Sequence, residues 1–411
     1  MIRIRLRGCV LSTLVALSMC TALLATPAAG ARVSAKPTGP PVKIMAMGPF
    51  SDPQTGYESP EWPGAAQARA KHVNTHGFLK DASGVTHKLV VIVCDAGIDP
   101  NLAEQCARQA VDEQVAAAVG YNGPSGAIII PILQAAGIPF IGNYPNDALA
   151  TSAENSFPLV SGGAGLFAGL PLQLQAEGAD SQYYAISDLG AATTGFIQVM
   201  VQATTDSSGI KLNDSVILAA DQVDLAPVVA AATQGDTTGV GIFILGDTAK
   251  NFVNTLRNSG HKQTIGTIAP FISNEFVSDL GGAAKGLLVT GTTRFQKTTK
   301  AGRMYAADMK AFNKKLPVND AGASYWLSTW VFERVATTLP TIDAASVLEA
   351  MGKLHDFDMG GMTPPISTDT EFTGKSPFPL PRLFNPTVVY YEAKNGKLVE
   401  VDGEFVDPFA G

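Results

Sequence analysis

The sequence predicts an α/β fold built on parallel sheets, and three observations carry this prediction. Between Leu89 and Asn143, short apolar runs alternate with helical runs, giving strand, helix, strand, helix, strand within about fifty residues. These strands are β-branched and apolar on both faces, as strands of a parallel sheet covered by helices are. The same alternation begins again after Ser161. Because parallel strands need crossover connections, each region is expected to be a series of βαβ units.

Composition sets the size and the class of the protein. The chain has 411 residues, of which 46% are hydrophobic and 16% charged, and this is enough for two domains with sizeable cores. Its formal charge of −7 gives no reason to expect nucleic acid or an anionic membrane surface as a partner. Beyond the first 25 residues, no apolar run is long enough to span a bilayer.

Residues 1–31 have the pattern of a secretory signal peptide. A basic start is followed by an apolar centre and a small-residue cleavage site: Arg3, Arg5 and Arg7, then Val10 to Ala25, then Ala29, Gly30 and Ala31. The alternative is a lipid anchor on Cys20, although Met19 is a poor residue immediately before a lipid-acceptor cysteine. Both alternatives place the protein outside the cytoplasmic membrane, in the periplasm, in the cell envelope or secreted.

Export makes the two cysteines of the mature chain informative. Cys94 ends a predicted strand and Cys106 lies in the helix that folds back along it, so a disulfide between them is geometrically plausible. A metal site would need more ligands than two thiols, and a catalytic thiol would need a nearby histidine. The sequence therefore favours a disulfide.

The elements of the first region follow a Pro- and Gly-rich segment at 32–41. The first strand is expected at 42–47, and the first helix at 63–75 begins with Pro63 near its first turn. Asp99 and Pro100 give the second helix a capping acid and a proline at its first position. The other expected elements are strands at 89–94, 115–119 and 137–143, a helix from 99 to 114, and a helix ending at 136.

The second region and the tail follow the same logic. Strands are expected at 182–187, 216–220, 240–245, 264–268 and 286–290, with helices at 191–203, 226–232 and 250–259 between them. Three further helices are expected at 302–314, 322–338 and 344–354. The chain then closes with a hairpin of strands at 387–392 and 397–401 around the turn pair Asn395 and Gly396.

Short motifs along this order of elements resemble those of one protein family. They are Gly48-Pro49-Phe50, Asn74-Thr75-His76-Gly77, Asp99-Pro100, Val223-Asp224-Leu225, Asp236 to Val240, and Leu280 to Gly286. From Val42 to Asp402 the chain resembles the type I periplasmic solute-binding proteins, of the branched-chain amino-acid/amide family of ABC importers. The order of the motifs along the chain carries this resemblance.

The resemblance implies two doubly wound parallel-sheet lobes joined by three hinge crossovers. Lobe one would comprise 42–160 plus 292–355, and lobe two 161–291 plus 356–411. The crossovers would lie near Val160, Gly291 and Asp356. In open parallel sheets ligands bind beyond the carboxyl ends of the strands, where helix N-termini offer unpaired N–H groups. A small ligand is therefore expected between the lobes.

The resemblance also implies ligand contacts, carried over one residue at a time. The candidate ligand-binding residues are Tyr57, Trp62, Asn122, Ser125, Asn143, Tyr144, Asp247 and Thr248. For each of them a purely structural role stands as the alternative: the aromatic residues could pack in the core, and Asn122 or Ser125 could cap a helix.

In the family that the chain resembles, an acid binds the ammonium group of an amino-acid ligand, and the resemblance places its equivalent at about Pro270 of this sequence. A buried ammonium needs an anionic or multiply hydrogen-bonding partner, because its desolvation costs several kcal/mol. Asp247 or Glu275 could substitute for the missing acid. If Pro270 is the true equivalent, the sequence favours a neutral, aromatic or apolar carboxylate, or an amide, over a standard α-amino acid.

Enzymatic and metal-binding alternatives find little support. Gly123-Pro124-Ser125-Gly126 lacks the Gly-x-Ser-x-Gly spacing of an exposed nucleophile, and no histidine follows it in a convincing triad order. His72 and His76 lie four residues apart, but no third ligand is near them in the sequence. No phosphate or dinucleotide motif is present, so no catalytic residue, metal or cofactor is predicted.

The sequence thus predicts a monomeric, extracytoplasmic solute-binding component of an ABC importer. Its partners would be a small-molecule ligand and a membrane permease, and no nucleic acid. A ligand-sensing receptor ectodomain of the same fold is the alternative function. A secreted hydrolase is a third alternative, which the sequence supports less.

Overall fold

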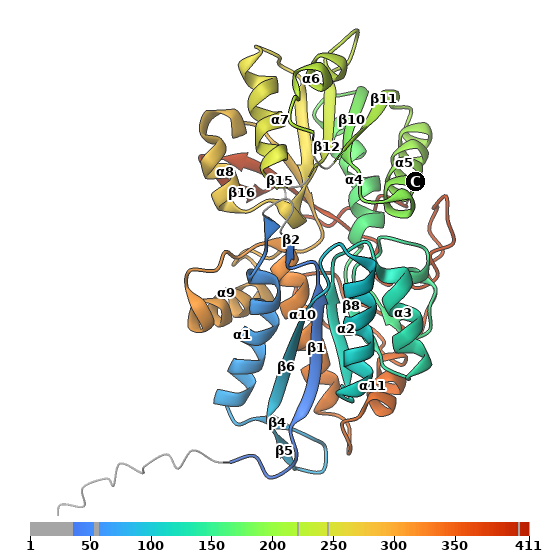
Figure 1. The fold of residues 1–411 in the computed structure, drawn as a ribbon, viewed down its shortest axis with the longest axis vertical. Helices are drawn as coiled ribbons and strands as arrows, with labels where there is room; N and C mark the ends of the chain where they lie inside the picture. The colour runs from blue at the N-terminus through green and yellow to red at the C-terminus, as the bar shows by residue number, and fades with distance from the viewer. Residues whose placement is uncertain (1–35, 53–56, 220–221, 245, 402, 411) are drawn as a thin grey trace, which may run out of the picture. The chain divides into compact units, whose positions relative to one another are not determined.

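Two sheets of mainly parallel strands organise the chain, as the sequence predicts (Figure 1). The structure is a computed structural model, and it describes residues 36–52, 57–219, 222–244, 246–401 and 403–410. The leader at 1–31 and Cys20 lie outside the described residues. Within the described ranges, no helix has both the length and the apolar character needed to cross a membrane.

The first sheet has five parallel strands in the order β6-β1-β7-β8-β9. They are β1 (Val42–Gly48), β6 (Leu89–Asp95), β7 (Ala117–Tyr121), β8 (Phe140–Asn143) and β9 (Ser156–Phe157). Every residue of β7 and β8 is buried. This agrees with the strands being apolar on both faces.

Helices cover both faces of the first sheet. α1 (Glu61–Thr75), α9 (Lys300–Asn313) and α10 (Asp320–Ala336) pack on one face, and α2 (Pro100–Asp112) and α3 (Gly126–Ala135) on the other. Each face of the first sheet has its own hydrophobic core, and successive residues of β1 point into one core or the other. Ile44 packs in the core that contains Trp62, whereas Met45 packs in the core that contains Cys106. α11 (Ala344–Met351) packs against α10.

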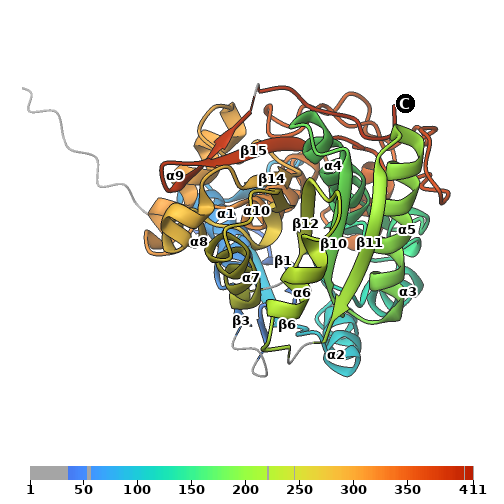
Figure 2. The ribbon, with the colours of Figure 1, turned by 90° about the horizontal axis from the view of Figure 1, so that it is seen from above.

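The second sheet has seven strands in the order β11-β10-β12-β13-β14-β15-β16 (Figure 2). The parallel strands are β10 (Ser181–Ser187), β11 (Lys211–Leu218), β12 (Gly239–Phe243), β13 (Thr264–Ile268) and β14 (Leu288–Gly291). β15 (Val389–Lys394) and β16 (Lys397–Glu400) add the antiparallel closing hairpin. Its turn places Asn395 at φ 52° and Gly396 at φ 73°, as the Asn-Gly pair predicts.

Two helices of the second region escape prediction from the sequence. α4 (Gly162–Ala176) contains four glycines and Pro171, so its local propensity argues against a helix. It forms because twelve of its residues are buried, against α5 (Ala191–Ser208) and strands β12 to β14. α8 (Asn274–Leu280) is only seven residues long and is capped by the Ser273 side chain. Here tertiary packing and capping outweigh propensity.

The remaining elements are short or differ from the prediction by a few residues. α6 (Ala226–Ala232) lies as predicted, whereas α7 (Gly246–Asn258) begins earlier than predicted. Short antiparallel pairs join β2 (Ser51–Asp52) to β3 (Tyr57–Glu58), and β4 (Leu79–Lys80) to β5 (Thr86–His87). Three 3₁₀ turns complete the described elements: η1 (Leu149–Thr151), η2 (Ala269–Phe271) and η3 (Gly281–Ala284).

The chain passes between the two sheets after β9, after β14 and again before β15. It reaches the second sheet for the last time at Val389, later than the crossover that the sequence places near Asp356. The segment 356–385 between these points contacts both sides. Arg382 donates to the carbonyls of Thr151 and Ser156, and the Phe378 ring stacks on Phe196 of α5.

Candidate ligand-binding site

A cavity of about 800 Å³ lies where loops from the carboxyl ends of both sheets meet. From the first sheet it is lined by residues that follow β1, β7 and β8, such as Pro49, Asn122 and Tyr144. From the second sheet it is lined by residues that follow β10, β12 and β13, such as Asp188, Asp247 and Pro270. This is the position at which open parallel sheets bind ligands.

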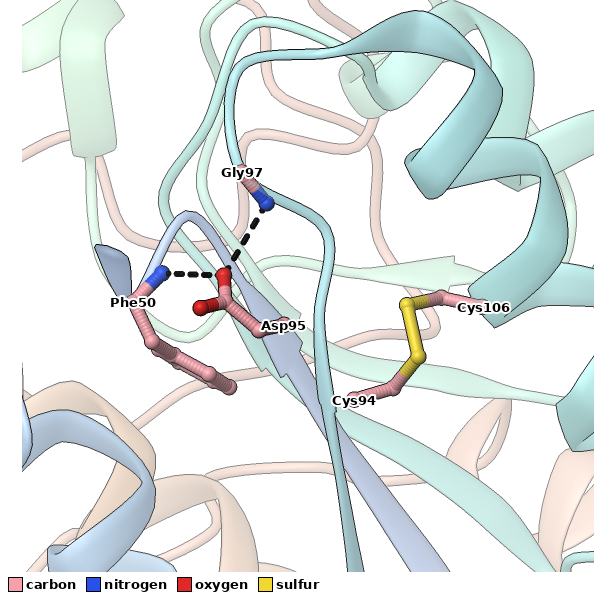
Figure 3. Close-up of a disulfide and its surroundings, with 5 residues drawn as sticks. All are labelled: Phe50, Cys94, Asp95, Gly97 and Cys106. Carbon is pink, nitrogen blue, oxygen red and sulfur yellow. Dashed lines mark hydrogen bonds between the residues drawn. A yellow bond between two sulfur atoms is a disulfide. The ribbon is translucent and has the colours of Figure 1, made fainter. Parts of the chain in front are cut away.

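One carboxylate fixes the loops that follow β1 and β6 (Figure 3). Asp95 Oδ1 accepts hydrogen bonds from the backbone N–H groups of Phe50, at 2.9 Å, and Gly97, at 3.0 Å. Its other oxygen accepts from the Ser51 hydroxyl at 2.6 Å. These bonds hold Pro49 and Ile98 in the cavity wall.

The disulfide expected from the sequence is present in the structure, beside this loop. Cys94 in β6 and Cys106 in α2 are bonded, with Cα atoms 5.6 Å apart (Figure 3). It joins the edge strand of the first sheet to the helix whose N-terminus borders the cavity.

Trp62 is the aromatic residue that the structure places in the wall near α1. Its side chain is fully buried, and its ring stacks on Tyr325 of α10 with centroids 6.0 Å apart. The Tyr325 hydroxyl donates to the carbonyl of Met47 in β1. Trp62 therefore packs in the core of the first region and also forms part of the cavity wall. Tyr57 lies in β3, and its side chain is outside the described part of the structure.

Asn122 and Ser125 line the cavity after β7. Ser125 precedes α3, but its hydroxyl makes no capping bond, and its backbone N–H donates to the Tyr121 hydroxyl at 2.8 Å. Burial raises the pKa of Tyr121 to about 12, so this hydroxyl stays neutral at physiological pH. Asn122 is 8% exposed, and its Nδ2 has no hydrogen-bond partner among the described residues.

The two residues predicted from the next loop have different positions. Tyr144 lines the cavity, its hydroxyl lies 3.3 Å from Thr292 Oγ1, and burial raises its pKa well above the usual value. Asn143 is not among the residues that line the cavity. Its amide bonds inward instead, to the Ala150 carbonyl and the Ser156 hydroxyl, and fixes β8 to the following turn.

Asp247 and Thr248 line the cavity from the start of α7. Lys250 Nζ forms ion pairs with Asp247, at 3.0 Å, and Asp279, at 3.1 Å. The hydrogen bond to Asp247 raises the pKa of Lys250. Asp247 is therefore paired within the chain. Pro270 and Glu275 also reach the cavity.

Several cavity residues were not anticipated from the sequence. Glu61 is 7% exposed, and its Oε1 accepts from Asn319 Nδ2 at 2.9 Å. Burial raises the pKa of Glu61 against the lowering effect of its hydrogen bonds. Phe167 lines the cavity from α4, and the glycines and the proline of α4 kept this helix from being predicted from the sequence. In the sequence, the only feature that could have indicated Glu61 as a cavity residue is its position directly before Trp62. Asn319 could have been recognised only as the residue that caps α10.

The His72 and His76 rings stack with centroids 4.1 Å apart, and His72 Nδ1 lies 2.7 Å from Asp308 Oδ1. In the part of the chain that the structure describes, no group of three or more histidine, cysteine or acidic side chains is arranged to hold a metal.

Comparison with known families identifies the chain. The sequence model of one family, described as periplasmic binding protein, matches residues 41–380. The chain belongs to the periplasmic binding protein family. Comparison with curated protein sequences gives no match.

Solved structures show the same fold as this periplasmic binding protein. A possible leucine/isoleucine/valine-binding protein from Rhodopirellula baltica has 15% identity and a TM-score of 0.72, over 90% of this chain and 98% of its own. The branched-chain amino acid transporter substrate-binding protein from Streptococcus pneumoniae, in complex with isoleucine, has 15% identity and a TM-score of 0.68, over 88% and 100%. An ABC-transporter solute-binding protein from R. palustris, in complex with benzoate, has 14% identity and a TM-score of 0.68, over 88% and 95%.

Family membership confirms several expectations from the sequence. The fold is that of the type I periplasmic binding proteins, with parallel-strand sheets and helices on both sides. The family is one of periplasmic binding proteins, so its members are binding proteins and not enzymes, and they work outside the cytoplasm.

Proposed function

We propose that this periplasmic binding protein captures a small amino-acid-like, amide or carboxylate ligand for an ABC importer. The observation that carries the proposal is the cavity of about 800 Å³, which is lined by loops from both sheets. A ligand there would contact both sides at once. Six of the eight residues expected at the site line it: Trp62, Asn122, Ser125, Tyr144, Asp247 and Thr248.

We further propose that the two sheets belong to lobes that close on the ligand. Lobe one would be 42–160 plus 292–355, and lobe two 161–291 plus 356–411, with the segment 356–385 between them. A ligand that contacts both lobes binds the closed state more tightly than the open one and so shifts the equilibrium toward closure. The closed monomer would then be recognised by the membrane permease.

The test is a thermal-shift screen of Arg32 to Gly411 against amino acids, amides, aromatic acids and short fatty acids. A ligand at a hundredfold excess over its dissociation constant stabilises by about 2.7 kcal/mol, which is readily measured. Small-angle scattering with the best ligand should show a smaller radius of gyration. A screen in which no class of small molecule raises the melting temperature would refute the proposal.

A matched pair of variants ties the binding to this cavity. Asn122→Ala removes a buried amide from the wall and should weaken binding of the ligand at least about fivefold, because one hydrogen bond is lost. Asn258→Ala changes an exposed amide at the end of α7, outside the cavity, and should leave affinity unchanged. Equal affinities of the two variants would place the binding site elsewhere.

A further inference from the structure

The cavity carries an excess of negative charge. Among its described lining residues there are six carboxylates and one cation, Lys250: the acids are Glu58, Glu61, Asp188, Asp247, Glu275 and Asp279. Lys250 is already bonded to Asp247 and Asp279. No described basic side chain in the wall is therefore left to receive the carboxylate of a ligand.

The N-terminus of α3 is also satisfied from within the chain. Helix N-termini in such clefts commonly attract anions through free N–H groups. Here the Ala127 N–H bonds to the Asp147 carboxylate, and the Ser125 N–H donates to Tyr121. Asp147 Oδ2 lies only 2.6 Å from where a Cβ on Gly126 would stand, so the space above the first turn is filled. These two N–H groups of the α3 start are therefore not free to bind a ligand carboxylate.

Four other helix starts around the cavity carry an acid in a similar place, whereas α4, which lines the cavity with Gly163, has none in its first turn. Asp188 Oδ1 accepts from the Gly190 N–H just before α5, at 2.9 Å. Asp247 and Glu275 stand in the first turns of α7 and α8, and Glu61 in that of α1. Each acid stabilises its own helix through the helix dipole. The joint effect is that the protein's own carboxylates screen most of the positive helix ends at the cavity, that of α4 excepted.

Two buried polar groups indicate what the cavity would bind. Glu61, 7% exposed, places a carboxylate in the wall that accepts from Asn319 Nδ2, from the Trp62 side chain and from its own backbone N–H, and no cation is paired with it among the described residues. Asn122 Nδ2, in a side chain 8% exposed, is a donor without a partner among the described residues. A buried donor without a partner destabilises the protein, and an acceptor on the ligand would satisfy it.

We infer that the cavity selects a small organic cation that carries a hydrogen-bond acceptor and no free carboxylate. The inference rests on the proposed function and narrows its ligand class. The cationic group faces Glu61, and the acceptor faces Asn122. The acids of the cavity repel a ligand that carries a carboxylate. The two solved complexes differ in this respect, because they hold isoleucine and benzoate.

The experiment compares one apolar group in four charge states by calorimetry and thermal shift. Leucinamide is a cation, leucine a zwitterion, 4-methylpentanamide neutral and 4-methylpentanoate an anion; phenylalaninamide, phenylalanine, 3-phenylpropanamide and 3-phenylpropanoate repeat the series on a benzyl group. The cation of either series should bind at least about tenfold more tightly than its carboxylate partners. Its affinity should fall as NaCl is raised, since the exposed rim acids are screened by salt.

Each outcome decides something. Tightest binding by a carboxylate, or equal binding by cation and neutral amide, overturns this inference and leaves the proposed function standing. Binding by none of the eight compounds or of the wider screen refutes the proposed function and this inference with it.

A variant pair locates the cationic group. Glu61→Gln should weaken binding of the cation at least about tenfold and that of the neutral amide less than about twofold. Glu104→Gln, an exposed acid on α2 outside the cavity, should change neither. Melting curves without ligand establish that both variants fold. Equal loss for cation and amide in Glu61→Gln would mean a structural role for Glu61 and would overturn the assignment.

Discussion

Asp320 shows how single buried acids hold this molecule together. It lies in the first turn of α10, fully buried, and accepts hydrogen bonds from the backbone N–H and hydroxyl groups of Thr292 and Thr293. These threonines follow β14, where the chain leaves the second sheet. Burial raises the pKa of Asp320 against the lowering effect of these four donors. One side chain thus fastens a crossover to the start of a helix.

Glu61 predicts a dependence of stability on pH. Its pKa is raised above 4.5 by burial, so the folded protein binds this proton at a higher pH than the unfolded chain does. The free energy of unfolding contributed by Glu61 is therefore largest below pH 4.5 and falls as pH rises through the folded-state pKa. Denaturant unfolding of the wild type and Glu61→Gln between pH 4 and pH 8 measures this.

The quantity to compare is the difference in the free energy of unfolding between the wild type and Glu61→Gln at each pH, because the contributions of all other titrating groups cancel in this difference. Wild type should gain stability relative to Glu61→Gln as pH is lowered. A difference that is constant with pH, or that shrinks on acidification, would contradict the raised pKa.

At the scale of elements, one ionic network joins three helices. Arg69 of α1 bonds to Asp308 of α9 at 3.1 Å and to Glu333 of α10 at 2.7 Å, with 6% of its side chain exposed. Asp308 also accepts from the Trp326 indole at 2.8 Å. The network fixes the helix layer on one face of the first sheet.

Arg69→Met should destabilise the protein by about 3 kcal/mol, because it removes the guanidinium from the buried Asp308, which keeps only His72 beside it, and from the partly buried Glu333. The measurement is the midpoint of urea unfolding at unchanged slope. Arg108→Met is the matched control: Arg108 is exposed on α2 and pairs with Glu104, which is worth about 0.5 kcal/mol or less. Similar losses in the two variants would show that the buried network adds nothing beyond a surface pair.

The disulfide links two other elements, β6 and α2. Its cysteines are 12 residues apart, and a loop of this size is expected to stabilise by about 3 kcal/mol. Cys94→Ala combined with Cys106→Ala should lower the free energy of unfolding by that amount. Reductant should lower the stability of the wild type to the same level and leave the variant unaffected. If reductant has no effect on the wild type, the bond is not formed in the exported protein.

At the scale of the whole molecule, the mature N-terminus follows from export. Cleavage of the predicted leader after Ala31 gives a protein that begins at Arg32. Intact mass spectrometry of the exported protein should therefore find residues 32–411 with no attached lipid and two hydrogens fewer than the reduced chain. A mass that begins at Cys20 with a diacylglycerol group would establish the lipid-anchored alternative instead.

What the sequence could determine was local pattern and order. Apolar β-branched runs identified the parallel strands, Asp99-Pro100 the start of α2, and Asn395-Gly396 the closing turn, because each acts within a few residues. The candidate site residues were implied by the family resemblance, on loops that follow strands. The alternation of strands and helices was therefore sufficient for the fold class.

Only the tertiary structure decided the features that depend on distant contacts. α4 is a helix because it is buried, against its own glycines. Glu61 belongs to the cavity because Asn319, far along the chain, lies beside it, whereas Asn143 bonds inward to Ser156. The charge of the cavity is the sum of acids from many loops. The net charge of the cavity cannot be read from any one stretch of the sequence, because only folding brings those loops together.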